Sequence, residues 1–454
     1  MSIDLLRSTI RGILLESTSG ALEGHILSFY EAVDMPISEL RDVFTAALGG
    51  SLESIQEKMD GQALTFTVKD GAVEGFSKGV SWDRVQRGGN TIEFYRSTYA
   101  DRPAVQYAYV SSMEALQSAV DKDPELASRL FQDGKVVIET AMLVPSNPNT
   151  IPYLKQHIRF IRAEALAPDA QVDQTAYQRF LDLASTSLER DGIDIQIGSV
   201  PILKPKAGDQ SAVGIDVLNR MLDQLLGELG LGDSTRILDV IMALVAKQLK
   251  KMGYQPKEVE LISKRLVAKW VVDEYRSLIP DAPDANALKK MGLWDAVSQI
   301  EKTTPLVDEA IIPLERIIQK LGHLLFQNLE FVLASNDTAD GEVLRQQVRD
   351  IDDMFKSGKI MTDQKKSESI RVALERIGGN VDMFEKAVEG VVFRWKGQLR
   401  KITGMFTAIN KLRGFFAYSI DPALRQVIDR GQAEKIKTNE SRSYLFKNKT
   451  TWVV

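Results

Sequence analysis

The spacing of hydrophobic and polar residues divides the chain into regions of helical and strand-like character. In residues 1–50 apolar side chains recur at helical intervals. The last of these series ends at Leu48, and Gly49 comes next, a residue type that commonly follows the final turn of a helix. Residues 51–205 carry short alternating runs separated by Asp-Gly, Gly-Gly and Asn-Pro pairs, which indicates strands joined by turns. Helical spacing returns over residues 206–380.

Individual elements can be assigned within the strand-like region. The predicted strands are ALTFTV (63–68), GAVEGF (71–76), AVQYAYV (104–110), KVVIETAML (135–143) and HIRFIRAEAL (157–166). Two helices are predicted among them, at residues 111–121 and 174–192.

The helical region contains two long apolar series. The first is predicted to begin at a cap formed by Asp233 and Ser234 and to end at Gly253. The second covers residues 306–335, and Pro313 is expected to kink it because proline removes a backbone donor inside a helix.

Residues 388–406 return to strand character on either side of a glycine turn. A hairpin that follows a helical block pairs most economically with the earlier sheet, so the block is interpreted as an insertion. The predicted fold class is therefore α+β. The predicted regions are a helical segment (1–50), a β-rich domain (51–205), a helical insertion (206–380), a return hairpin (381–410) and a basic C-terminal tail (411–454).

Composition narrows the class of protein. The chain has 454 residues, more than one ordinary domain needs, and its 44% hydrophobic and 26% charged residues are typical of soluble globular proteins. No window is apolar enough to span a membrane, and charges interrupt the N-terminal apolar stretch, unlike a signal peptide. We therefore expect a soluble cytoplasmic protein with no membrane partner.

The absence of cysteine excludes disulfides, thiolate metal sites and cysteine nucleophiles together. The three histidines, His25, His157 and His323, lie far apart, which argues against a zinc or iron site. Any catalysis would then depend on lysines, carboxylates and oxygen-bound cations.

Charge is distributed unevenly along the chain. Residues 391–454 contain 13 Lys or Arg against 4 Asp or Glu, a local charge of +9 that leaves −14 for the rest of a chain whose formal net charge is −5. A cationic tail on an acidic body favours a polyanionic partner such as nucleic acid, although the same charges also fit a solvated surface.

A lysine precedes an Asp-Gly pair at two places. In VKDGAV, Lys69 stands directly before Asp70 and Gly71 between two alternating runs, as in an ordinary hairpin turn. In EKMDGQALTF, Met59 separates Lys58 from an Asp-Gly pair that opens a strand. This arrangement would leave Lys58 at the edge of a sheet.

A second constellation lies more than 300 residues further on. Glu389 and the glycine after it precede two apolar residues, and Lys396 and Lys401 come next. Lys-x-Asp-Gly, with Glu-Gly and two apolar residues later in the chain and lysines beyond them, resembles motifs I, IV and V of the covalent nucleotidyltransferases, which include polynucleotide ligases and mRNA capping enzymes. Lys78 in FSKG and Glu139 at the end of GKVVIE are similar to motifs Ia and III.

This resemblance implies an antiparallel-sheet nucleotidyltransferase domain with an ATP-grasp-like ligase fold, in which Lys58 forms a lysyl-AMP intermediate. A lysine amine is nucleophilic only when deprotonated, and nearby cations both favour its neutral form and hold phosphates. The resemblance implies that ATP is held by Asp60, Gly61, Lys78, Glu139, Glu389, Lys396 and Lys401, and that Mg²⁺ is held by Glu139 and Glu389. Phe160 and Tyr153 are candidates for stacking on the purine, and neither is assigned.

The members of this superfamily differ in the segment that comes after motif V. DNA ligases and capping enzymes carry an oligonucleotide-binding barrel there, whereas 51 residues follow Thr403 here (454 minus 403), and residues 414–436 among them have helical spacing. The resemblance therefore favours an ATP-dependent RNA ligase of phage type, acting in the host cytoplasm on nucleic acid, with RNA preferred over DNA.

Two other hypotheses stay open. One is a nucleotidyltransferase-fold scaffold for nucleic-acid binding or assembly that does not ligate, and the other is a self-adenylylating enzyme that passes AMP to a different acceptor. The sequence leaves open the oligomeric state and the role of the helical insertion.

Overall fold

The structure is a computed structural model. It describes residues 26–59, 61–77, 80–145, 153, 155–185, 188–190, 193–200, 202–203, 211–327, 329, 368, 371–372 and 390–403. The described residues form a mixed α+β fold with mainly antiparallel sheets, which confirms the predicted fold class at that level.

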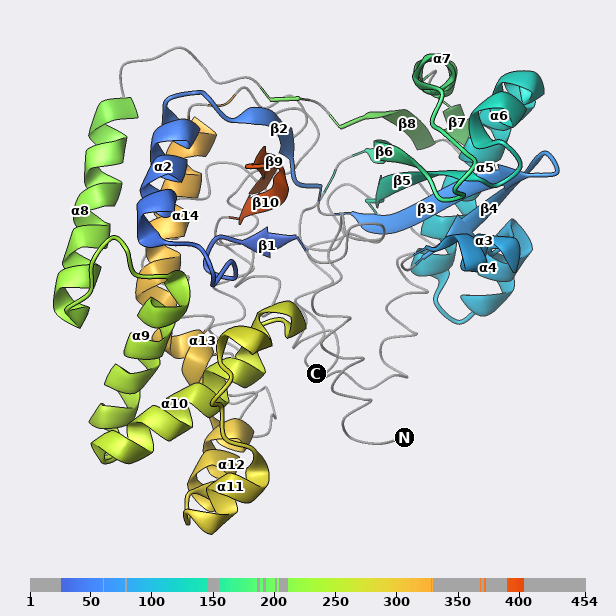
Figure 1. Ribbon diagram of the computed structural model, residues 1–454. Coiled ribbons are helices and arrows are strands. Elements are labelled where there is room, and N and C mark those ends of the chain that lie inside the picture. Colours follow the sequence, from blue (N-terminus) through green and yellow to red (C-terminus); the bar gives the residue numbers. More distant parts are fainter. Residues whose placement is uncertain are drawn as a thin grey trace, which may run out of the picture.

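The described strands form two sheets (Figure 1). The first has the order β1 (Leu27–Ser28), β10 (Gln398–Thr403), β9 (Gly390–Trp395) and β2 (Glu53–Glu57), and only the β1–β10 pair is parallel. The second has the order β4 (Ala72–Phe76), β3 (Gln62–Lys69), β5 (Val136–Leu143), β6 (Gln156–Ala165), β8 (Ile193–Ser199) and β7 (Leu188–Arg190), and only β6–β8 is parallel.

The four-stranded sheet shares one core with most of the helices. These helices are α2 (Ile37–Leu48), α8 (Ser211–Leu229), α9 (Ile237–Lys251), α10 (Pro256–Trp270), α11 (Ala285–Lys290), α12 (Trp294–Thr303), α13 (Leu306–Ala310) and α14 (Ile312–Gln327), with a 3-10 helix at Asp273–Leu278. Val391, Phe393 and Ile402 of the β9–β10 hairpin are buried in the same cluster as apolar residues of α2, α8, α9 and α14. We call this unit the helical lobe.

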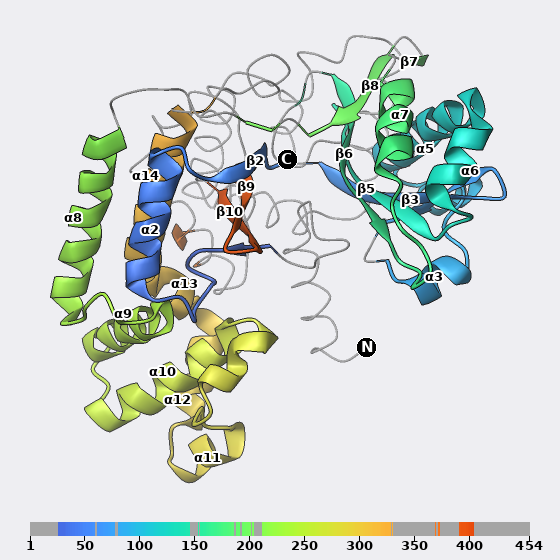
Figure 2. The same cartoon turned by 45° about the horizontal axis from the view of Figure 1, so that its top comes forward.

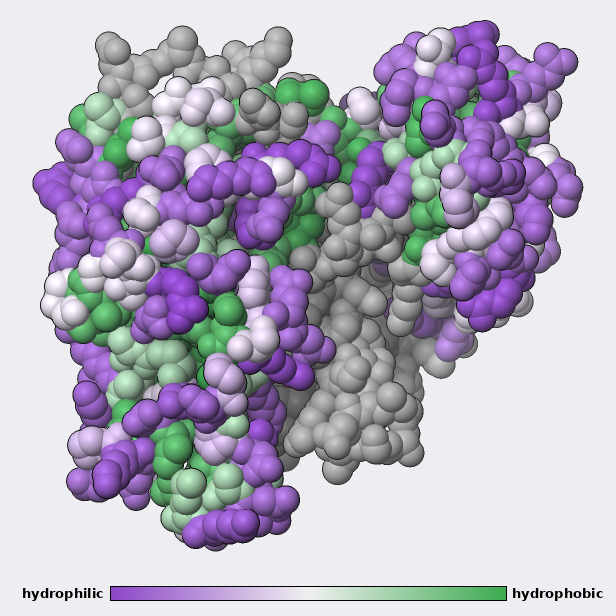
Figure 3. Space-filling view, viewed as in Figure 1, coloured by the Kyte–Doolittle hydropathy of each residue, from purple (hydrophilic) through white to green (hydrophobic). Residues whose placement is uncertain are grey.

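The six-stranded sheet has a separate core, and we call this unit (residues 61–200) the sheet lobe. Its helices are α3 (Trp82–Gln86), α4 (Ile92–Thr98), α5 (Pro103–Lys122), α6 (Pro124–Phe131) and α7 (Gln174–Ala184). Apolar residues of α5, α6 and α7 pack with β3, β5, β6 and β8 in one cluster (Figure 2). The visible face of the sheet lobe is mainly hydrophilic (Figure 3).

The described chain crosses between the lobes at two places. The first crossing comes after β2, where Lys58 leads to Gly61 and β3. The second comes after β8: the Val200 N–H donates to the Phe160 carbonyl in the sheet lobe, and the Leu203 N–H donates to the Ile55 carbonyl in the helical lobe. The strand that precedes Lys58 and the strand that comes after it therefore belong to different sheets.

Several predicted elements are confirmed. The helix ending at Gly49 is α2, and the lysine of VKDGAV precedes a hairpin turn in which Asp70 and Gly71 have φ values of 51° and 78°. The long series containing Pro313 is broken into α13 and α14 just before that proline.

Three element predictions are wrong in detail. AVQYAYV belongs to helix α5, because Ala104, Val105, Ala108 and Tyr109 are buried at helical intervals that continue beyond it. The predicted helix 174–192 ends earlier, as α7, and its last part contains strand β7.

The helix after Asp233 begins later than predicted, with Arg236 as its N-cap residue. The Asp233 carboxylate instead accepts hydrogen bonds from Arg41 of α2, at 3.1 Å from Nε and 2.9 Å from Nη2. Asp233 is thus paired with α2, and at the start of α9 the Arg236 N–H donates to Asp239 Oδ2 at 3.2 Å.

Burial of Tyr95 makes a pH prediction. Tyr95 is fully buried and stacks on Tyr109 with ring centroids 4.6 Å apart, and burial raises the pKa of its hydroxyl from 10.0 to about 12. Because the folded state holds this proton more tightly, the stabilisation is complete below pH 10 and is lost as the pH rises toward 12. We expect the free energy of unfolding to fall by about 2–3 kcal/mol more in the wild type than in Tyr95→Phe over this interval. Urea denaturation of both proteins from pH 9 to 12 measures this difference. An equal loss of unfolding free energy with pH in the two proteins would contradict the raised pKa of Tyr95.

Candidate functional site

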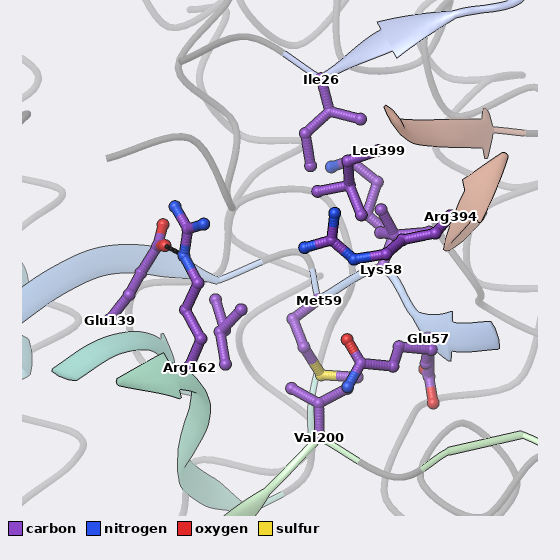
Figure 4. Close-up of a pocket in the computed structure, with 12 residues that line it drawn as sticks. Ile26, Glu57, Lys58, Met59, Glu139, Arg162, Val200, Arg394 and Leu399 are labelled. Carbon is purple, nitrogen blue, oxygen red and sulfur yellow. Dashed lines mark hydrogen bonds and ion pairs between the residues drawn. The ribbon is translucent and has the colours of Figure 1, made fainter. Parts of the chain in front are cut away.

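A cavity of about 230 Å³ lies where the two lobes meet (Figure 4). Each lobe contributes part of its wall. The lining residues are Ile26, Gln56, Glu57, Lys58, Met59, Val392, Arg394 and Leu399 from the helical lobe and the first crossing, and Glu139, Ile161, Arg162 and Val200 from the sheet lobe.

Lys58 is placed in this cavity by its position just after β2. Glu57, the last residue of β2, pairs with Val391 of β9, and the Lys58 N–H donates to the Gly390 carbonyl at 2.8 Å. Lys58 is only 3% exposed. The structure therefore brings Lys58 next to the glycine of the second constellation, although 332 positions (390 minus 58) separate them in the sequence.

The glycines of both motifs lie at close approaches of the backbone. A Cβ atom on Gly61 would lie 2.6 Å from Leu143 Cδ2 and 2.7 Å from the Met142 carbonyl oxygen of β5. A Cβ atom on Gly390 would overlap the Ile402 carbonyl oxygen of β10. A side chain at either position would push apart strands that form the cavity wall.

Glu139 is buried in the cavity wall beside an arginine. Its side chain is 1% exposed, and its Oε2 accepts a hydrogen bond from Arg162 Nε at 3.0 Å. A β-bulge at this point of the β5–β6 pair shifts the register between Glu139 and Thr140, so that consecutive residues Ile161 and Arg162 both line the cavity. Bulges of this kind commonly redirect a side chain next to a functional site.

The alternation of side chains along β9 determines which of its residues line the opposite wall of the cavity. Val391 and Phe393 of β9 face the helical core, whereas Val392 and Arg394 line the cavity. Lys401 of β10 pairs directly with Val392, so it lies on the same face of the sheet as the cavity. It is not a lining residue, and its Nζ lies 3.8 Å from Glu31 Oε2.

The structure does not bring Lys396 to the cavity. Lys396 and Gly397 form the turn of the β9–β10 hairpin with φ values of 48° and 80°. The exposed Lys396 ammonium lies 3.1 Å from Glu39 of α2, and Trp395 Nε1 donates to the same carboxylate at 2.8 Å. Both side chains anchor the hairpin to α2.

Three of the predicted site residues, Asp60, Lys78 and Glu389, lie outside the described residues. Of the two carboxylates predicted to hold Mg²⁺, only Glu139 is described, and its Oε2 lies 3.0 Å from Arg162 Nε. Within the described part of the chain, no group of three or more carboxylate or histidine side chains is placed to hold a metal ion.

The two candidate stacking residues are buried. Phe160 is 1% exposed and lies 5.7 Å, centroid to centroid, from Phe66 in the core of the sheet lobe, and Tyr153 is 3% exposed. Their burial leaves no ring face for a nucleotide base.

Arg162 and Arg394 are two cationic cavity residues that no predicted motif included. Arg162 had a faint signal, because Arg159 and Arg162 stand three apart in a predicted strand, a spacing that regular alternation does not produce. Arg394 had a clearer one, since it comes directly after three buried apolar residues on a strand beside the predicted motif IV.

Comparison of the chain with protein-family models, curated proteins and solved structures gives no match. None of the helices in the described ranges carries an apolar segment long enough to cross a bilayer.

The close approach at Gly390 can be tested by substitution. We expect Gly390→Ala to lower the free energy of unfolding by about 2–4 kcal/mol, because the new methyl group overlaps the β10 backbone. Gly227→Ala in α8 is a matched control, since no atom lies within 4 Å of its new Cβ. The control should be neutral or stabilising by up to about 1 kcal/mol. Chemical denaturation compares them, and an unaffected Gly390→Ala would refute the close packing.

Proposed function

We propose that the chain is an ATP-dependent RNA or polynucleotide ligase of the covalent nucleotidyltransferase class, with Lys58 as the nucleophile. The observation that carries the proposal is the meeting of Lys58 with Gly390 at the wall of a cavity between two sheets. A solvated turn lysine would need neither burial nor this partner. Lys69, which precedes the other Asp-Gly pair, lies beside a hairpin turn and does not line the cavity.

The proposed first step forms a lysyl-AMP. Lys58 Nζ, after losing its proton, attacks the α-phosphorus of ATP, so that an N–P bond forms as the bond from the α-phosphorus to the bridging oxygen breaks and pyrophosphate leaves with the electron pair. The cavity walls would hold the nucleotide so that the amine and the α-phosphorus are in line.

Two further transfers complete the proposed ligation. A 5′-phosphate oxygen of the polynucleotide attacks the phosphorus of the lysyl-AMP, which releases the lysine. A 3′-hydroxyl then attacks the activated 5′-phosphate and AMP leaves. ATP would enter as its magnesium complex, in which the ion is held mainly by the phosphates and by water. No step is assigned to a protein-bound metal.

The proposal predicts a covalent label on one lysine. Purified protein incubated with magnesium and α-labelled ATP or, separately, GTP should become labelled on a denaturing gel, and Lys58→Ala should abolish the label because the attacking amine is absent. Lys69→Ala is the matched control and should be labelled like the wild type.

The other outcomes separate the alternatives. Absence of label from folded protein, shown by mass spectrometry not to be adenylylated beforehand, would overturn the enzyme proposal and favour a scaffold. Label that persists in Lys58→Ala would assign the chemistry to another residue. Label on Lys58 without joining of 5′-phosphorylated RNA would favour transfer of AMP to a different acceptor.

A further inference from the structure

The cavity places arginines from both lobes against one space. Arg162 comes from β6 of the sheet lobe and Arg394 from β9 of the helical lobe. In Figure 4 the Arg394 side chain reaches from its strand toward the side of the cavity where Arg162 lies. Lys58 lines the same cavity, so three cationic side chains converge there.

The Arg162 side chain is held in a fixed orientation. Glu139 Oε2 accepts a hydrogen bond from Arg162 Nε at 3.0 Å. The Glu139 side chain lies on the neighbouring strand β5 and is only 1% exposed. A guanidinium carries five N–H donors in a planar fork, and Glu139 contacts the Nε edge. Arg162 Nη1 lies 3.9 Å from Glu164 Oε2 on the same strand, so carboxylates on β5 and β6 together position this guanidinium group beside the cavity (Figure 4).

Guanidinium groups match phosphate oxygens in geometry and bind them through paired, charge-assisted hydrogen bonds. Among the described lining residues, Glu57 and Glu139 are acidic and Lys58, Arg162 and Arg394 are basic, so these five residues carry a formal charge of +1 (three minus two).

We propose that Arg162 and Arg394 form a phosphate-binding site that bridges the two lobes, with Glu139 as the positioning residue for Arg162. The ligand is a phosphate group, from either the phosphate chain of a nucleotide or the 5′-phosphate of a polynucleotide. Glu139 then serves the site through the arginine and not as a metal ligand. The assignment of a nucleotide or polynucleotide as the source rests on the proposed function, whereas anion binding itself does not require Lys58 to react.

Calorimetric titration of the full chain tests this site with two probes. Inorganic tripolyphosphate represents the nucleotide phosphate chain, and a 5′-phosphorylated oligoribonucleotide, compared with its 5′-hydroxyl form, represents the polynucleotide end. Arg394→Gln should weaken binding of the relevant probe roughly 10- to 100-fold, the usual effect of losing charge-assisted hydrogen bonds.

Arg162→Gln alone would leave the Glu139 carboxylate buried without its partner and could unfold the sheet lobe. The double variant Glu139→Gln with Arg162→Gln keeps the pair neutral and should show the same weakening while remaining folded by circular dichroism. Arg220→Gln on the exposed face of α8 removes one positive charge from a helix that contributes no described residue to the cavity lining, and it should bind like the wild type.

The results distinguish this site from the ligase chemistry. Weakening of either probe by both cavity variants but not by Arg220→Gln supports the site, and the probe that responds identifies the source of the phosphate. Failure of both probes to bind the wild type, or equal binding by wild type and folded cavity variants, would overturn it. Because tripolyphosphate has no nucleoside to transfer, its binding is independent of whether Lys58 becomes labelled with AMP.

Discussion

The hydrogen bond from the Lys58 N–H to the Gly390 carbonyl is the contact on which the candidate site depends. It extends the β2–β9 pairing by one residue, at the point where the chain leaves the four-stranded sheet for the six-stranded one. The position of Lys58 is therefore only as well defined as that of the β9–β10 hairpin. The hairpin in turn is held by a core shared with α2, α8, α9 and α14 and by the contacts of Trp395 and Lys396 with Glu39. The helices that interrupt the two motif groups in sequence thus support the wall of the cavity in space.

Local signals were sufficient to predict much of the fold. Helical spacing located α2, and the turn residues located the β3–β4 and β9–β10 hairpins, because Asp-Gly and Lys-Gly pairs adopt the positive φ values that tight hairpins need. AVQYAYV was misassigned because seven residues of apolar and aromatic character fit a strand when they are considered without the later turns of α5. The separation of the strands into two sheets was not predictable from periodicity, because β2 (ESIQE) has little apolar alternation of its own and its sheet is decided by its pairing with β9.

Only part of the candidate site was predicted from the sequence, because a motif can identify a residue but does not specify how strands pair. A sequence motif identified Lys58 and Glu139, and the structure places both on one cavity. Arg162 faces that cavity through a β-bulge, which depends on how two strands pair and is not specified by either strand alone. Lys396 was predicted from motif-like spacing but does not reach the cavity. It lies in the hairpin turn, where its ammonium group pairs with Glu39 of α2. For Glu139 the prediction was partly sufficient: it lines the cavity, but its contact with Arg162 was not predicted from the sequence.

The way the two lobes are threaded also sets an order of assembly. The sheet lobe is one continuous segment, from Gly61 to Val200, and its strand contacts can form as soon as that segment has been synthesised. The four-stranded sheet has no such independence, because β9 and β10 lie between β1 and β2 and arrive more than 300 residues after them. Contacts of such long sequence separation form late and slowly. During synthesis, Lys58 thus remains attached to a finished sheet lobe on one side and to an unfinished sheet on the other, and the cavity is completed only when the hairpin inserts.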